Sequence, residues 1–214
     1  MIRSEAEARD WLVERMSADS ATMDRLERLV ALLREENQRQ NLVSAASLEQ
    51  VWRRHIADSA QLLTLLPPGQ AVEPWLDLGS GGGFPGLVVA ALRPEREVVL
   101  VESRPLRTTW LERSLRELGL SKSRVIASRL ELVESFPAGV ISARAFATLD
   151  KTLWLSARFS TNGTCWLLPK GRAARDELSK LRGWNHLFHV EQSLTDESSG
   201  IIVGTLRQAK RRNP

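Results

Sequence analysis

A dense group of glycines directly after a short apolar segment constrains the fold of this chain more than any other feature. The segment Trp75–Leu78 has the composition of a buried strand, and the apolar run at 87–92 has that of a helix. Between them stand Gly79, Gly81, Gly82, Gly83 and Gly86. Glycine permits positive φ and lets a ligand approach main-chain N–H groups without meeting a Cβ atom. The pattern predicts a strand, a tight turn that holds a nucleotide-like cofactor, and a helix with Pro85 at its first position.

The spacing of the glycines fits two cofactor classes. Gly81, Gly83 and Gly86 match the GxGxxG pattern of dinucleotide-binding enzymes, with Glu102 at the end of the next strand to bind ribose hydroxyls. Asp77 followed by alternating glycines instead resembles motif I of the S-adenosylmethionine-dependent methyltransferases. In that resemblance the turn at Gly79 and Gly81 faces the methionine part and the ribose, and Glu102 accepts hydrogen bonds from the ribose diol. A tight turn in some other α/β protein is the alternative without a cofactor.

Length and composition limit the class of protein. A chain of 214 residues with 43% hydrophobic residues can bury one sizeable core, so we expect one α/β domain with an appendage. The single cysteine, Cys165, excludes an internal disulfide and a cysteine-built zinc site, and no metal is expected. Neither a membrane-spanning apolar run nor a signal-peptide core is present, which favours a cytoplasmic protein without membrane contact.

The pattern of apolar residues changes at about residue 71, which divides the chain into a helical N-terminal extension (1–70), a sheet domain (71–207) and a basic tail (208–214). Ser47 and Gln50 form a capping box for a helix at 48–66, stopped by Pro67, Pro68 and Gly69. Expected helices are 5–16, 20–40, 48–66, 85–92, 105–118, 149–159 and 172–182. Expected strands are 73–78, 97–102, 124–127, 139–144 and 163–169, then a hairpin of 184–193 and 200–207.

This order predicts a Rossmann-like, mostly parallel sheet of seven strands that ends in an antiparallel hairpin, which is the class I methyltransferase architecture. The N-terminal helices are expected to dock on the sheet domain. Trp75, Trp154 and Trp166 have apolar neighbours, which favours core packing over stacking on nucleic-acid bases.

Positive charge is concentrated in two segments, although the net charge is only +4. The segment 103–129 has seven basic residues, among them Arg113 and Arg116, against two acidic ones, and the C-terminus adds Arg207, Lys210, Arg211 and Arg212. Concentrated positive charge suits a polyanion such as RNA. A solvated helix face and a tail without function are the alternatives.

Five short elements together resemble one family. They are Asn41–Ser44, Arg54–Ser59, Asp77–Gly86, Ser142–Ala147 and Pro169–Gly171. Their order and spacing closely resemble the bacterial 16S rRNA (guanine-N7)-methyltransferase G family, also called glucose-inhibited division protein B, over residues 25–206. The resemblance implies S-adenosylmethionine as cofactor, methylation of guanine N7 in the 530 loop of 16S rRNA, and 16S rRNA or the 30S subunit as partner. We expect a monomer.

The resemblance also assigns cofactor-binding positions. Gly79 and Phe84 in the glycine loop, Leu130 and Glu131 after the third strand, and Arg144 after the fourth match the family's S-adenosylmethionine-binding residues. Leu130 and Glu131 would bracket the adenine. An ordinary amphipathic turn at 130–133 and a surface ion pair at Arg144 are the alternatives for these residues.

Three residues are candidates for holding the target base or its phosphate. His55 shares a helix face with Val51 and Leu62, so packing competes with a role in the pocket. Lys170 follows the fifth strand and would bind phosphate as a point charge, unless it is a surface residue at a helix start. Arg144 would serve both cofactor and base.

No catalytic residue is assigned, because guanine N7 has a free lone pair and needs no deprotonation. The chain has no Tyr, which excludes the Asn/Asp-Pro-Pro-Tyr motif of enzymes acting on exocyclic amines. Cys165 is not in a Pro-Cys pair, which argues against carbon-five methylation of pyrimidines through a covalent adduct. An NAD-dependent oxidoreductase and a methyltransferase of small molecules are the alternatives.

Overall fold

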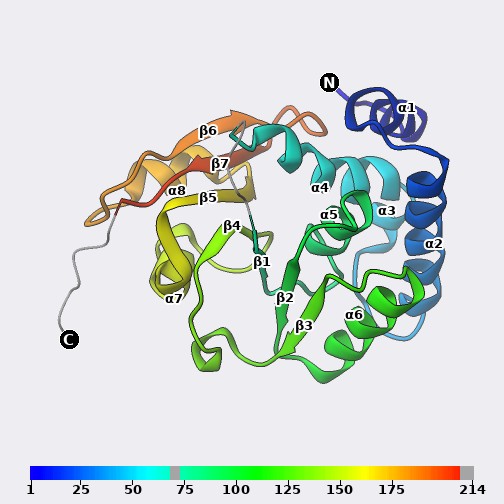
Figure 1. Cartoon of the computed structure of the whole chain (residues 1–214). Coiled ribbons are helices and arrows are strands. Elements are labelled where there is room, and N and C mark those ends of the chain that lie inside the picture. Colours follow the sequence, from blue (N-terminus) through cyan, green and yellow to red (C-terminus); the bar gives the residue numbers. More distant parts are fainter. Residues whose placement is uncertain (68–72, 208–214) are drawn as a thin grey trace.

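The computed structural model describes residues 1–67 and 73–207. Its centre is a seven-stranded sheet in the order β3-β2-β1-β4-β5-β7-β6 (Figure 1). The strands are β1 (Trp75–Leu78), β2 (Val98–Glu102), β3 (Arg124–Ala127), β4 (Ala138–Ala143), β5 (Ser160–Gly171), β6 (His189–Gln192) and β7 (Gly200–Gly204). The first five are parallel, and β7 runs antiparallel to both β5 and β6. The predicted sheet and its terminal hairpin are therefore confirmed.

The hairpin strands are shorter than expected. Strands β6 and β7 lie within the predicted ranges 184–193 and 200–207 but do not fill them. In the remaining parts of these ranges, an isolated bridge pairs His186 with Leu206. Thr195, expected in a polar connecting loop, is only 4% exposed. The loop packs against the N-terminal helices, so some of its polar side chains form hydrogen bonds and ion pairs within the protein.

Helices cover both faces of the sheet (Figure 1). One face carries α5 (Gly86–Leu92) and α6 (Pro105–Glu117), and the other carries α7 (Leu149–Ser156) and α8 (Ala174–Lys180). Each face has its own cluster of buried apolar side chains. Trp75 and Trp166 are fully buried as expected, but Trp154 is 72% exposed, so its predicted core position is wrong. Trp154 lies on the outer side of α7, so its apolar neighbours in the sequence did not indicate burial.

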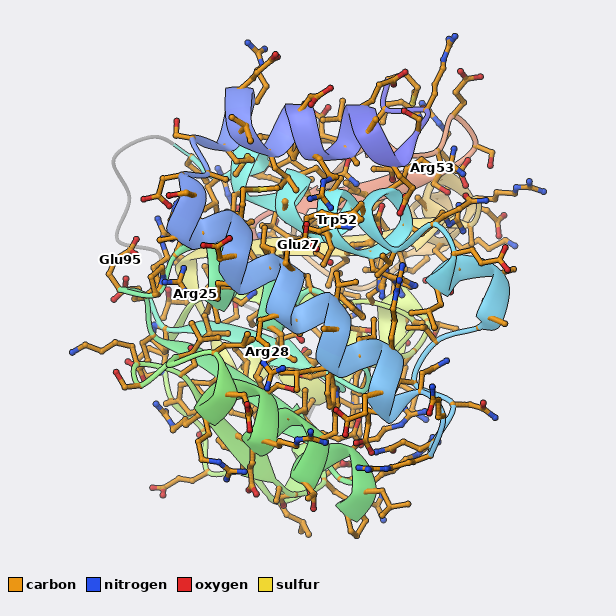
Figure 2. All side chains as sticks on the ribbon, turned by 90° about the vertical axis from the view of Figure 1, so that its right-hand side faces the viewer. Arg25, Glu27, Arg28, Trp52, Arg53 and Glu95 are labelled. Atoms are coloured by element: carbon orange, nitrogen blue, oxygen red, sulfur yellow. The ribbon has the colours of Figure 1, made fainter. Side chains whose placement is uncertain are left out.

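The N-terminal helices complete the core beneath α5. Leu12 of α1 (Glu5–Met16) and Leu29 of α2 (Ser20–Glu36) are fully buried in the same cluster as Val89. Figure 2 looks onto this side, with α2 crossing in front of the sheet domain. The boundary proposed at residue 70, the helix stop at Pro68 and Gly69 and the basic tail 208–214 lie outside the described residues.

Charged side chains fasten α2 to the sheet domain. Arg25 donates to the carbonyl oxygen of Ala91 at 2.9 Å, and Arg28 pairs with Glu117 of α6 at 2.6 Å (Figure 2). Arg113 of α6 contacts Glu35 and Glu36 at 3.1 and 3.6 Å. Arg113 is therefore a partner of α2 instead of a free cation for RNA, while Arg116 is exposed.

The segment predicted as one helix at 48–66 is broken. A short helix α3 (Ala45–Leu48) is capped by Ser44, whose hydroxyl accepts from the amide of Ser47, so the predicted Ser47 cap is wrong. After a turn come a π-helical stretch η1 (Trp52–Ala57), α4 (Asp58–Ala60) and the 3₁₀ turn η2 (Gln61–Leu65). The Glu5 carboxylate accepts from the amides of Trp52 and Arg53 at 2.9 and 2.8 Å. A cap supplied from α1 leaves no local signal in the sequence.

The glycine turn has the predicted conformation. Gly79 and Gly81 have φ of 62° and 54°. A Cβ atom at Gly86 would lie 2.2 Å from Leu100 and 2.8 Å from the Asp77 carboxylate, so only glycine fits between α5 and the sheet. Pro85 precedes the first helical residue instead of occupying that position as expected, a shift of one residue at the helix start.

Beneath the turn, the Asp77 carboxylate is fully buried. Its Oδ1 atom accepts from the Ser142 hydroxyl of β4 at 2.7 Å, and its Oδ2 atom accepts from the amide of Gly86 at 3.2 Å. Trp75 donates in turn to the Ser142 hydroxyl at 2.8 Å. Burial raises the pKa of Asp77 from 3.8 to about 6, although these hydrogen bonds oppose the shift. Asp77 thus joins β1, β4 and the start of α5.

Removal of the Glu5 cap should weaken the attachment of α1. We expect Glu5→Ala to lower the free energy of unfolding by about 1–2 kcal/mol, because two amides of η1 lose their acceptor. Urea denaturation measures the loss. Glu14→Ala, at an exposed position of the same helix, is the matched control and should change stability by less than about 0.5 kcal/mol. Equal stability of the two variants would contradict the capping role.

The raised pKa of Asp77 predicts a pH-dependent cost. Between pH 4 and 6 the folded protein holds a proton that the unfolded chain has released, so the contribution of Asp77 to stability falls as pH rises. The amide introduced by Asp77→Asn does not ionise in this range. The stability of the wild type minus that of Asp77→Asn should therefore decrease by about 2 kcal/mol from pH 4 to pH 7. Chemical denaturation at several pH values tests this, and a difference independent of pH would show that Asp77 titrates normally.

Candidate active site

Two cavities open beside each other at the carboxyl ends of the central strands, where α/β sheets place their ligands. The first, about 310 Å³, follows the ends of β1 and β2, and the second, about 530 Å³, lies between β4, β5 and the N-terminal helices. Ala145 and Ala147 line both, so the segment after β4 forms the wall between them. The first contains Gly79, Glu102, Arg104, Arg107, Leu130, Glu131 and Phe146. The second contains His55, Asp58, Arg144, Lys170, Glu177, Thr195 and Asp196.

Glu102 at the end of β2 presents its carboxylate to the first cavity. It accepts from the amides of Gly81, Ser103 and Arg104 at 3.0, 2.7 and 2.9 Å. These bonds fix the carboxylate against the glycine turn, while it still lines the cavity. A fixed carboxylate at this place can accept hydrogen bonds from vicinal hydroxyls of a ribose.

Leu130 and Glu131 form the far side of the first cavity in the turn η3 (Leu130–Leu132). Leu130 is 5% exposed and offers an apolar surface, whereas Glu131 is exposed and pairs with Arg129 at 3.1 Å. The two residues bring an apolar and a polar group to one rim, as a flat heterocycle requires.

The glycine turn is covered by Phe146. A Cβ atom at Gly79 would lie 2.5 Å from the Phe146 ring, so the ring rests directly on this glycine. Ala145, the residue before it, has φ of 53°, a conformation that a non-glycine residue rarely adopts. A strained residue therefore stands where the two cavities meet.

The second cavity holds a bonded cluster of His55, Asp58 and Arg144. Arg144 donates to His55 Nδ1 at 3.0 Å, to the carbonyl oxygen of Arg54 at 3.2 Å and to Asp58 Oδ2 at 3.4 Å. The Phe84 ring lies beneath both, 4.7 Å from the His55 ring and 5.1 Å from the guanidinium carbon. The sequence analysis identified His55, Arg144 and Phe84 as candidate site residues, but it did not predict the contacts among them.

His55 is neutral. Burial, helped by the Arg144 and Arg54 cations, lowers the pKa of His55 to about 3. Because Nδ1 accepts from Arg144, the ring proton is on Nε2, which donates to the Ser47 hydroxyl at 3.0 Å. Both ring nitrogens are therefore occupied.

Lys170 is committed to the protein as well. Its side chain is 8% exposed, pairs with Glu177 of α8 at 3.1 Å and donates to the carbonyl oxygen of Ala147. The cation thus holds the wall between the cavities in place. Its remaining capacity for a phosphate is small, although it lines the second cavity.

Several site residues were missed. Asp58 accepts from Thr195 of the hairpin loop at 2.7 Å, and Asp196 pairs with Arg54 at 3.2 Å. Hydrogen bonds from Ser198 hold the pKa of Asp196 at about 2. Asp58 stands in the Arg54–Ser59 element, which was a usable signal, but the loop approaches it only through the tertiary fold.

Three expected cofactor residues lie behind the cavity walls. Asp77 is fully buried, Phe84 is 4% exposed, and the Gly81 amide is bound by Glu102. They support the residues that face the cavities. Over the described residues, no cluster of three His, Cys, Asp or Glu side chains could hold a metal ion. None of the helices in residues 1–67 and 73–207 has the length and apolarity needed to cross a membrane.

Solved structures with this architecture include proteins with a bound cofactor. A crystal structure of a variant of MtNAS in complex with S-adenosylmethionine has a TM-score of 0.59 and 15% identity, covering 96% of this chain and 84% of that one. Cofactor-bound Rv0187 from MTB has a TM-score of 0.62 and 16% identity, covering 94% and 97%. At these identities the likeness concerns the fold alone.

Comparison at the sequence level is more specific. The family model described as GidB, rRNA small subunit methyltransferase G, matches residues 22–200. The ribosomal RNA small subunit methyltransferase G of Novosphingobium aromaticivorans is 56% identical, over 99% of this chain and 92% of that protein. The protein of the same name from Erythrobacter litoralis is 58% identical, over 95% and 97%. The chain therefore belongs to the rRNA small subunit methyltransferase G family.

Proposed function

We propose that this protein transfers a methyl group from S-adenosylmethionine to guanine N7 in the 530 loop of bacterial 16S rRNA. The observation that carries the proposal is the pair of cavities that share Ala145 and Ala147, one suited to an adenosine and the other large enough for a nucleotide base. Family membership supports the use of small-subunit rRNA. The N7 position and the 530 loop rest on the sequence resemblance.

The first cavity fits the cofactor in shape and donor set. Glu102 would bind the ribose hydroxyls, Leu130 and Glu131 would bracket the adenine, and the glycine turn, with Gly79 in the cavity lining, would meet the methionine part. Arg144, at the edge of the second cavity, carries the positive charge that a carboxylate needs. When bound, S-adenosylmethionine supplies an electrophilic methyl group on a sulfonium sulfur.

The second cavity suits a base that becomes positively charged. Guanine N7 attacks with a lone pair in the base plane, and no proton moves. The chain must then position the base and stabilise the charge that it gains. The carboxylates of Asp58, Glu177 and Asp196 line this cavity and balance the cations Arg144, Lys170 and Arg54 there. These groups together would therefore not repel a positively charged base. We assign no catalytic acid or base.

The cations available for RNA are only a part of those expected from charge alone. Arg113 is engaged with α2, whereas Arg54 and Arg144 line the second cavity and Arg104 and Arg107 line the first. Because Arg54 is paired with Asp196 and Arg144 with Asp58, Arg104 and Arg107 are the cations that would meet phosphates of an RNA that inserts one base. We propose 16S rRNA or the 30S subunit as the partner of a monomer in the cytoplasm.

Mapping of the methylated nucleotide tests the proposal. Incubation with labelled S-adenosylmethionine and either 30S subunits or deproteinised 16S rRNA should label one guanine of the 530 loop. Because N7-methylguanine is cleaved after borohydride and aniline treatment, the strand should break at that position. Label on an exocyclic amine or a ribose hydroxyl would contradict the proposed mechanism. Label on small molecules and not on RNA would contradict rRNA as the substrate.

Calorimetry with S-adenosylmethionine and NAD distinguishes the cofactor classes. We expect heat of binding with S-adenosylmethionine and none with NAD, because the chain belongs to a methyltransferase family. Binding of NAD without binding of S-adenosylmethionine would support the oxidoreductase alternative and overturn the proposed function.

A further inference from the structure

The Arg144 guanidinium is only partly satisfied by the protein. Its Nη1 atom donates to Arg54 and Asp58, and its Nη2 atom donates to His55. A guanidinium has five N–H groups. In the part of the chain that the structure describes, the N–H of Nε and one N–H of Nη2 therefore have no partner. Because adjacent N–H groups of arginine match the two oxygens of a carboxylate, the unpaired groups indicate a carboxylate ligand.

A carboxylate explains these donors better than the target base does. On guanine, an arginine that donates in this way binds O6 and N7 together. That contact would occupy the N7 lone pair, which must accept the methyl group. The α-carboxylate in the amino-acid part of S-adenosylmethionine has no such conflict. Arg144 also lies directly before Ala145 and above Phe84, next to the glycine turn.

His55 has one bond that no packing role requires. Its ring stacks on Phe84 at 24° between the ring planes, which any aromatic residue could do. The lone pair of Nδ1, however, accepts from Arg144 at 3.0 Å, and the Ser47 hydroxyl holds Nε2 and hence the ring orientation. With both nitrogens engaged, His55 has no atom left for the base or its phosphate.

Resting on the proposed function, we infer that His55 is a positioning residue that turns Arg144 toward the α-carboxylate of S-adenosylmethionine. Asp58 supports the same guanidinium from the other side at 3.4 Å. His55 acts through Arg144 and takes no part in proton transfer. This assignment replaces the expectation that His55 holds the target base.

Two substitutions separate the bond from the packing. His55→Phe keeps an aromatic ring over Phe84 and removes the acceptor. His55→Asn loses the ring but keeps an acceptor oxygen close to the place of Nδ1. His189→Phe is the matched control, because His189 is exposed on β6 and pairs only with Glu191 among the described residues.

Two ligands separate the carboxylate from the adenosine. S-adenosylhomocysteine carries the amino-acid part, and 5′-methylthioadenosine has the same adenosine and sulfur without it. By calorimetry, His55→Phe should weaken binding of S-adenosylhomocysteine about tenfold and that of methylthioadenosine less than about twofold. His55→Asn should recover most of the loss, and His189→Phe should change neither affinity. In steady-state kinetics the KM for S-adenosylmethionine should rise while the KM for RNA stays constant.

The remaining outcomes overturn the inference. Equal weakening of both ligands by His55→Phe would show a general structural role, and unchanged binding of both would show that Arg144 is held without His55. Wild-type protein that fails to bind S-adenosylhomocysteine would contradict the proposed function itself. Wild-type binding with an unaffected variant would contradict the positioning role alone.

Discussion

The buried carboxylate of Asp77 is the interaction on which the site depends. One oxygen is bonded to Ser142 of β4, and the other to the amide of Gly86 at the start of α5. Because Gly86 follows the glycine turn, the turn is anchored at both ends to the middle of the sheet. Both cavities open above this anchor. Burial raises the free energy of the charged form, so the protein accepts a local cost for a fixed turn.

The polar groups of the site are mostly bonded to one another. Glu102 holds three amides, Lys170 holds the segment after β4, and His55 holds Arg144. Such bonds fix side chains before a ligand arrives, which lowers the entropy lost on binding. In the methyl transfer to guanine N7 that we propose, no proton is transferred, so fixed geometry would be the main contribution of the protein.

The parts of this structure that could be predicted from the sequence have local causes. The apolar strands β1 and β2, the glycine turn and Glu102 at a strand end follow from residues close together in the chain. The broken helix at 48–66 could not be predicted, because Glu5 caps its second half from α1. The contact between Asp58 and Thr195 joins residues far apart in the sequence, and no sequence pattern near either residue predicts it. The contacts of His55 and Lys170 could not be predicted for the same reason, since their partners come from other elements.

The second cavity draws its walls from Ser44 near the start of the chain and from Ile201 near its end. The amide of Ile2 also donates to the carbonyl oxygen of Leu194 at 2.7 Å, which closes the first helix onto the last hairpin. During synthesis on a ribosome, the N-terminal helices and the parallel strands emerge before the strand pair that completes this wall. A nascent chain therefore lacks a complete second cavity until the residues up to Ile201 have left the ribosome.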